Sequence, residues 1–243
     1  MEQISAIARN PEQRVPPPEK PRHFALSRTT DRVLQILLRG DLSRLRAESV
    51  AEELGMSSTT LRRLLRAKLG LSAEQVTYLC TALHVPDESW QDAVEGVLGR
   101  SRFDLLVPPE HYDAAMRLYR QRRHKDKLHG VGLLDVERIL SGERPAQPGS
   151  LAEEVHSEHP AARALANLLL GGITKCDELE DLRQHRTAVT RECFVRRNYS
   201  TRHLNPRHYR RWFIGDRAIP RQIEGRQEQL EAIRQELLAL QSQ

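Results

Sequence analysis

Hydrophobic residues recur at helical spacing in the first third of the chain, between Thr30 and Leu71. They fall three or four positions apart in three successive stretches, which begin at Val33, Val50 and Leu61. This spacing places the apolar side chains on one face of a helix. We therefore predict three amphipathic helices in this region.

From residue 75 onward the pattern changes to an alternation of two kinds of segment. Helical spacing continues at 89–98, 111–122 and 161–170. Short apolar or strand-like runs lie at 76–85, 103–107, 188–190 and 194–199. Helices that alternate with short strands are typical of α/β or α+β domains. We therefore expect a mixed domain that extends to about residue 216.

The C-terminal segment, residues 217–243, is charged and carries one apolar stripe. Its apolar positions alternate three and four apart, with an interruption at Arg226, and are Ile223, Leu230, Ile233, Leu237 and Leu240. Such a repeat predicts a short coiled-coil helix. The alternative is a surface helix packed on its own domain, because about three heptads is near the minimum length for a coiled coil.

Composition adds a preference for polyanionic partners. The chain has a net charge of +5 and a sequence pI of about 9.4. Clustered Arg and Lys gain affinity for nucleic acid by releasing counterions from phosphates. No apolar run reaches the length of about 18–20 residues that crosses a bilayer, and the N-terminus lacks the order of a signal peptide. We therefore expect a cytoplasmic, nucleoid-associated protein without membrane contact.

Residues 46–69 have the pattern of a helix-turn-helix. Ala51 is small enough for a second helix to cross closely, Gly55 suits the turn, and Ser57 is placed to cap the next helix. The polar side of that next helix is expected to face DNA, with short polar groups near base edges and arginines on phosphate or guanine. The predicted DNA-binding residues are Ser58, Thr59, Thr60, Arg62, Arg63 and Arg66.

The stretch 41–70, and in particular AEELGMSSTTLRRLL at 51–65, resembles the first helix-turn-helix of AraC/XylS-type transcription regulators. In that family two such units read adjacent segments of the major groove, whereas the resemblance here covers a single unit. It implies double-stranded DNA as the partner and regulation of transcription as the function. The alternative interpretation is a helical hairpin with a solvated arginine face.

Three later segments, at 84–112, 149–192 and 199–230, resemble the hinge region and the start of the returning coiled coil of SMC-like ATPases. The likeness is strongest to the MukB-like ATPases of bacterial condensin-type and plasmid-defence systems. This resemblance implies a dimerisation module at the tip of an antiparallel coiled coil, with a basic surface that can contact DNA. The implied partner is a second copy of the chain, giving a homodimer, or an SMC-like protein.

The nucleotide-binding part of that family has no counterpart in this sequence. A phosphate-binding loop of the form GxxxxGK[ST] is absent, because none of the five lysines follows a glycine. The helix-turn-helix stands where the outgoing coiled-coil arm would be expected, so the chain is interpreted as a natural fusion, a truncated remnant or a wrongly assigned reading frame. We therefore expect no ATPase activity and no cofactor.

A second basic stretch, residues 191–211, interleaves arginines with Phe194, Tyr199 and Tyr209. Guanidinium groups bind phosphate, and exposed aromatic rings stack on unpaired bases. The predicted secondary basic surface consists of Arg196, Arg197, Arg202, Arg207, Arg210 and Arg211. An equally consistent interpretation is a strand pair with one solvated basic face and an aromatic core.

Patterns for catalysis or metal binding are weak. His208 and Arg211 give the H-x-x-R of tyrosine recombinases, but Tyr209 is the last tyrosine of the chain, so the nucleophile is missing. Pro160 directly follows the pair His156 and His159, which disfavours a zinc site there. Three widely spaced cysteines are expected to be buried or inert, and these are Cys80, Cys176 and Cys193. We predict no catalytic residues, no metal site and hence no enzyme.

These observations predict an α+β fold that is mainly helical. Its expected parts are a proline-rich, disordered leader at 1–26, a three-helix helix-turn-helix unit at 27–74, a hinge-like α+β domain at 75–216 and a coiled-coil helix at 217–243. The leading hypothesis is an AraC-like DNA-binding regulator that dimerises through the hinge-like domain. The alternative is an SMC-like hinge and coiled-coil fragment that serves as a dimerisation module without ATPase activity.

Overall fold

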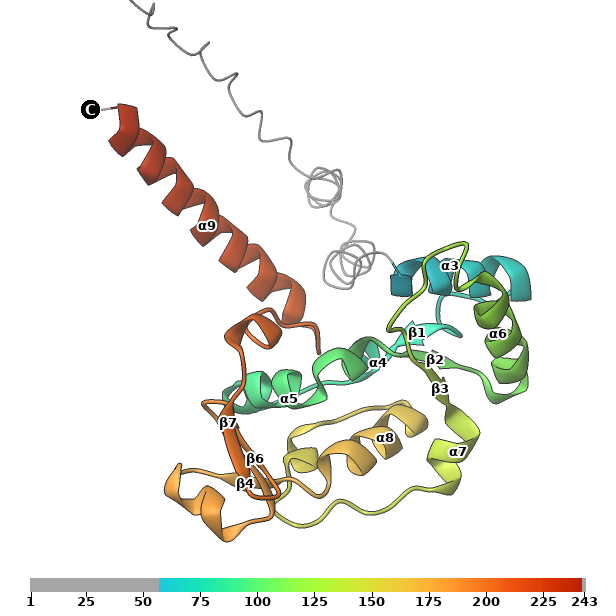
Figure 1. Ribbon diagram of the computed structural model, residues 1–243, viewed down its shortest axis with the longest axis horizontal. Coiled ribbons are helices and arrows are strands. Elements are labelled where there is room, and N and C mark those ends of the chain that lie inside the picture. Colours follow the sequence, from blue (N-terminus) through green and yellow to red (C-terminus); the bar gives the residue numbers. More distant parts are fainter. Residues whose placement is uncertain (1–56, 242–243) are drawn as a thin grey trace, which may run out of the picture.

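The computed structural model describes residues 57–241 of the chain (Figure 1). These residues form two small β-sheets with helices around them. The expected leader and the first two expected helices lie outside these residues. A long C-terminal helix, α9, extends away from the rest of the molecule (Figure 1). The fold class is mixed α+β with a large helical share, in agreement with the sequence pattern.

The helices follow the apolar periodicity closely. The α-helices are α3 (Ser57–Leu69), α4 (Leu79–Ala82), α5 (Gln91–Leu98), α6 (Pro109–Arg122), α7 (Val136–Ser141), α8 (Pro160–Leu170) and α9 (Ala218–Gln241). Short 3-10 turns are η1 (Glu88–Trp90), η2 (Gly99–Phe103), η3 (Leu151–Glu154), η4 (Glu180–Gln184) and η5 (Pro206–His208). The sequence-based prediction is confirmed for α3, α5, α6, α8 and α9, while the short α7 had no expected counterpart. The run 76–85 was expected to be strand-like, but only Thr77–Tyr78 belong to a strand and Leu79–Ala82 form the helix α4.

The first sheet has three short strands, β1 (Thr77–Tyr78), β2 (Leu105–Val107) and β3 (Leu133–Asp135). Strand β1 is antiparallel to β2, and β3 is parallel to β2. All three residues of β2 are buried, as expected for a central strand. The strand expected in the apolar run at 103–107 is thus present as Leu105–Val107, in the middle of the sheet, while Phe103 ends η2.

The second sheet has four strands in sequential order, β4 (Thr174–Cys176), β5 (Thr187–Thr190), β6 (Phe194–Arg197) and β7 (Ser200–His203). Strands β4 and β5 are parallel, whereas β5, β6 and β7 are antiparallel. A two-residue loop joins β6 to β7, and Asn198 in that loop has a positive φ of 54°. Asparagine tolerates this left-handed conformation better than most residues, so it suits the tight turn.

One hydrophobic core connects α3 to the region that follows it. Leu61 and Leu65 of α3 are fully buried and belong to the same cluster as Tyr78 and Leu106. Helix α3 also packs on α6. The third helix of the helix-turn-helix pattern is thus part of the packed body.

A buried carboxylate, Glu95 on α5, fixes the segment that leads into α9. Its Oε1 accepts hydrogen bonds from the backbone amides of Phe213 (2.5 Å) and Ile214 (2.8 Å). Its Oε2 lies 3.2 Å from Nε of Arg102, which is also buried. Burial raises the pKa of the Glu95 carboxyl, while the Arg102 guanidinium and the two amides act in the opposite direction.

Arg102 completes this connection. Its Nη1 donates hydrogen bonds to the carbonyl oxygens of Glu95 (2.7 Å) and His208 (2.8 Å). Its guanidinium carbon lies 4.7 Å from the ring centroid of Phe103 and 5.1 Å from that of Phe213. Aromatic rings therefore enclose the ion pair, and Arg102 connects α5 and η2 to the end of η5. The segment just before α9, which we call the root of α9, is thus held firmly to the core.

Candidate nucleic-acid interface

Helix α3 has one buried face and one exposed basic face. Leu61 and Leu65 are in the core, whereas Arg63, Arg66 and Lys68 are exposed. The leucines were predicted to face inward and the two arginines outward, and the structure agrees. Lys68 adds a third exposed cation, which is not among the predicted DNA-binding residues.

Arg62 is placed differently from the prediction. Its Nε donates to the Val76 carbonyl oxygen at 2.6 Å and its Nη2 to the Ala73 carbonyl oxygen at 2.9 Å. Its guanidinium carbon also lies 5.4 Å from the ring centroid of Tyr78, and its partial burial lowers its pKa. The expectation that Arg62 points out toward DNA is therefore wrong, because the side chain fastens α3 to the segment that enters β1.

The short polar residues at the start of α3 are also less available than expected. Ser58 is 0% exposed, so the prediction that it touches a base edge is wrong for this arrangement. The Thr59 hydroxyl lies 3.2 Å from the Tyr78 hydroxyl, and both Thr59 and Thr60 are half-buried. The polar tip of the helix thus helps to pack α3 on β1, and the exposed arginines are what remains for a partner.

The arginine-rich stretch forms the β6–β7 hairpin and the turn after it. Arg197, Arg202, Arg207 and Arg210 are exposed, as predicted. Arg196 is half-buried, and its Nε donates to the His185 carbonyl oxygen at 3.1 Å while Nη1 donates to Oγ1 of Thr201 at 3.3 Å. The guanidinium carbon of half-buried Arg211 lies 5.4 Å from the Phe213 ring centroid. Four of the six arginines are therefore presented to solvent.

The aromatic residues of this stretch separate into two groups. Tyr199, at the tip of the hairpin, is 95% exposed. Tyr209 is buried, and its hydroxyl lies 3.2 Å from Nε2 of His203. Phe194 is half-buried and packs against the same histidine, with 4.8 Å between the two ring centroids. Both earlier interpretations thus apply in part, because one ring is free to stack and two belong to the packing beneath a basic surface.

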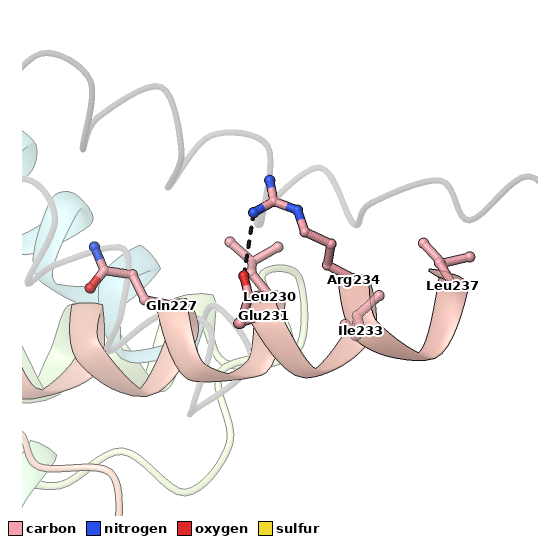
Figure 2. A pocket seen from close by; sticks show the side chains of 6 residues that line it. All are labelled: Gln227, Leu230, Glu231, Ile233, Arg234 and Leu237. Atoms are coloured by element: carbon pink, nitrogen blue, oxygen red, sulfur yellow. Dashed lines mark hydrogen bonds and ion pairs between the residues drawn. The ribbon is translucent and has the colours of Figure 1, made fainter. Parts of the chain in front are cut away.

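The apolar stripe of α9 is solvent-exposed over its last three turns. Figure 2 shows side chains of Leu230, Arg234 and Leu237 projecting from one side of the helix, with Arg234 reaching back to Glu231. The exposed fraction is 61% for Leu230 and 68% for Leu240. The helix predicted from residue 217 onward is confirmed. Among the described residues, none covers the apolar side chains of its last three turns.

Between residues 57 and 241, no three His, Cys, Asp or Glu side chains come together in a way that would hold a metal ion. Every helix of that range is too short or too polar to span a membrane. The three cysteines are free and buried, as predicted, and burial raises the pKa of Cys193 to about 12.

A family model described as a helix-turn-helix domain matches residues 34–90 of the chain. The match includes the whole of α3 and continues to the end of η1. It confirms the predicted helix-turn-helix without specifying the AraC/XylS type. No curated protein shows significant sequence similarity to the chain.

Solved structures similar to this one include SMC hinge domains. The Pyrococcus furiosus SMC hinge domain is 18% identical with a TM-score of 0.48, and the match covers 65% of this chain and 85% of that one. The same hinge with an extended coiled coil is 18% identical with a TM-score of 0.45, covering 88% and 84%. An asymmetric dimer of the Geobacillus stearothermophilus SMC hinge domain is 17% identical with a TM-score of 0.44, covering 70% and 73%.

Proposed function

We propose that the chain is a DNA-binding protein of the transcription-regulator kind, AraC-like in its use of α3, and not an enzyme. Helix α3 enters the major groove of duplex DNA, and Arg63 and Arg66 contact phosphate or guanine there. The observation that supports this proposal is a pair of exposed arginines on a helix of the helix-turn-helix, whose opposite face is buried by its own domain.

The spacing of the two arginines suits such a contact. Arg63 and Arg66 are three positions apart on α3, so they project from neighbouring points of one helix surface. Within residues 57–241 no carboxylate lies at salt-bridge distance from either of them. Both guanidinium groups therefore keep their donors for an anionic partner, which Arg62 does not.

Binding of full-length protein to duplex DNA tests this proposal, measured by fluorescence anisotropy over a series of salt concentrations. The slope of log K against log salt is negative, and each phosphate contact contributes about 0.9 to its magnitude. The double variant Arg63→Gln/Arg66→Gln is therefore expected to make the slope less steep by about 2. The matched control Arg138→Gln/Arg144→Gln removes the same charge from two exposed arginines elsewhere and is expected to leave the slope nearly unchanged. Equal slopes for both double variants would remove α3 from the interface.

Pairing of two chains supplies the second half-site that one helix-turn-helix unit lacks. Helix α9 is the element that we propose for this pairing, because its apolar stripe is exposed on a long helix. Fully burying one leucine or isoleucine side chain contributes about 1.5–3 kcal/mol. Two α9 helices packed stripe to stripe would therefore gain stability from several such side chains.

A second candidate function rests on the same helix. If α3 does not bind DNA, the chain is a dimerisation module, similar to an SMC hinge with part of its coiled coil, and it has no ATPase activity. Light scattering on the full chain tests the pairing, with Leu237→Asp expected to shift a dimer toward monomer at tens of micromolar. The control Gln235→Asp adds the same charge to another position of α9 and is expected to leave the dimer intact. A wild-type chain that is monomeric at this concentration would overturn pairing through α9.

A further inference from the structure

One short segment of the chain carries a dense cluster of positive charge. Residues 117–127, RLYRQRRHKDK, contain six Arg or Lys residues and one Asp, so their net charge of +5 equals that of the entire protein. The charges of the remaining residues sum to zero, although residues 191–211 form a second basic stretch. We refer to residues 117–127 as the basic turn.

The basic turn comprises the end of α6 and the turn that follows it. Arg117, Arg120, Arg123 and Lys125 are exposed. Within residues 57–241, none of these four side chains has a carboxylate at salt-bridge distance. The single acidic residue of the segment, Asp126, is not available to them, because it holds Arg122 through contacts of 2.6 and 3.2 Å.

The backbone of this segment is well ordered by hydrogen bonds. The Asp126 amide donates to the Arg122 carbonyl oxygen at 2.9 Å, and the amide of buried Leu128 donates to the Arg123 carbonyl oxygen at 2.9 Å. The Tyr119 hydroxyl donates to the Val131 carbonyl oxygen at 3.0 Å and so ties α6 to the segment beyond the turn. The exposed cations are thus displayed on a fixed support, which reduces the entropy that is lost when they bind a ligand.

Helix stability alone does not account for so many cations. Basic residues in the last turn of a helix interact favourably with its dipole, but this effect is confined to that turn and is worth about 0.3–1 kcal/mol. Arg120 and Arg122 are already sufficient for it in α6. Lys125 lies beyond the helix end, and Arg117 lies more than one turn before it. These extra charges repel one another and are consistent with a polyanionic ligand.

The position of the basic turn indicates which polyanion it binds. Helix α6 packs directly on α3, and the two helices occupy the same corner of the molecule (Figure 1). DNA bound to α3 therefore brings its sugar-phosphate backbone to this corner. We infer that the basic turn binds the phosphates of duplex DNA beside the groove that α3 enters, an inference that rests on the proposed function.

Contacts of this kind position the protein and add affinity, but they do not read sequence. The ammonium group of Lys125 and the guanidinium groups of Arg117 and Arg120 each neutralise a phosphate and release counterions. Loss of these contacts therefore weakens binding to specific and random duplexes by the same factor. Loss of a base contact on α3 weakens binding to the preferred sequence most.

The test compares two triple variants of the full-length protein in the anisotropy titration. Arg117→Gln/Arg120→Gln/Lys125→Gln is expected to reduce the magnitude of the salt slope by about 2–3, at about 0.9 for each phosphate contact. Arg138→Gln/Arg144→Gln/Arg183→Gln removes the same charge from exposed arginines outside the basic turn and is expected to change the slope by less than half as much. Circular dichroism of both variants checks that the fold is retained.

The outcomes separate this inference from the proposed function. If the α3 double variant loses binding while the two triple variants behave alike, the basic turn does not contact DNA and the regulator proposal stands. If the triple variant of the basic turn reduces the magnitude of the salt slope and the α3 double variant does not, the turn binds DNA and α3 does not. A wild-type chain that binds no duplex overturns both proposals. Poly-glutamate that competes as well as duplex DNA at equal charge would assign the turn to an acidic protein instead.

Discussion

Helices α3 and α9 are both amphipathic, but the apolar face of α3 is buried and that of α9 is exposed. Leu61 and Leu65 of α3 are fully buried by the rest of the chain, whereas Leu230 and Leu237 of α9 remain largely exposed. What α3 leaves for a partner is therefore cationic, and what α9 leaves is apolar. Two helices with similar hydrophobic periodicity in sequence thus point to two chemically different partners, a polyanion and another apolar helix.

The two helices also differ in how they are attached to the body. Arg62 fastens α3 to the segment before β1, and Leu61 and Leu65 are buried in the core. Helix α9 is held at its root, where Glu95 accepts from the amides of Phe213 and Ile214. One helix is therefore a component of the core, and the other is an arm that leaves it.

The largest effect is expected at the root of the arm. Glu95→Ala leaves the buried Arg102 guanidinium without its carboxylate and two amides without an acceptor, which costs about 3–5 kcal/mol of unfolding free energy. Urea denaturation followed by circular dichroism measures it. Glu231→Ala, which removes the exposed partner of Arg234 on the arm itself, is expected to cost less than about 1 kcal/mol. Similar losses for the two variants would mean that Glu95 does not anchor α9.

The next effect contrasts leucines of the two helices. Leu65→Ala is expected to cost about 2–5 kcal/mol, because it removes a fully buried side chain and leaves a cavity. Leu237→Ala is expected to change the unfolding free energy by less than about 0.5 kcal/mol at protein concentrations low enough to keep the chain monomeric. Denaturation curves at two protein concentrations distinguish the intrinsic cost from any loss of pairing. A large cost for Leu237→Ala in the monomer would show that the stripe packs on its own chain.

A smaller effect separates two adjacent arginines of α3. Arg62→Ala removes two hydrogen bonds to backbone carbonyl oxygens and is expected to cost about 1–3 kcal/mol of stability. Arg63→Ala is expected to cost less than about 0.5 kcal/mol and to act on DNA affinity instead. Thermal unfolding and anisotropy on the same two variants provide both readouts. The contrast fails if Arg63→Ala destabilises the fold as much as Arg62→Ala does.

The smallest expected effect tests the polar tip of α3. Tyr78→Phe removes the hydroxyl that contacts Thr59 and should lower the unfolding free energy by about 1 kcal/mol. Tyr199→Phe makes the same change on a fully accessible ring of the β6–β7 hairpin, where no stability change is expected. Urea denaturation of both variants would contradict this account if the two losses were equal.

Much of the fold follows from local pattern. The apolar periodicities of α3, α5, α6 and α8 each imply an inward face, and each of these helices packs on the core. The stripe of α9 was also visible in the sequence, although the sequence could not indicate that this stripe stays exposed. Strand β3 and helix α7 were not predicted, because three strand residues followed by six helical residues are too few to establish either period.

The errors at the candidate site have a common cause. The polar positions of α3 were assigned to solvent because they alternate with buried leucines, yet β1 and the segment before it cover one edge of that polar face. Ser58 is buried there, and Arg62 finds two carbonyl acceptors from residues more than ten positions away. Such tertiary contacts cannot be read from spacing. The basic turn, in contrast, is visible in the sequence as a charge cluster, but it matches no familiar motif.

The contact between Glu95 and the Phe213–Ile214 amides joins residues about 120 positions apart in the sequence. The start of the arm is thus held by α5, which lies between β1 and β2 in the chain. Any shorter version of the protein that keeps the arm but begins after α5 would expose two unsatisfied amides at its base. Design of truncated forms should therefore treat residues 91–102 and 208–219 as one inseparable unit.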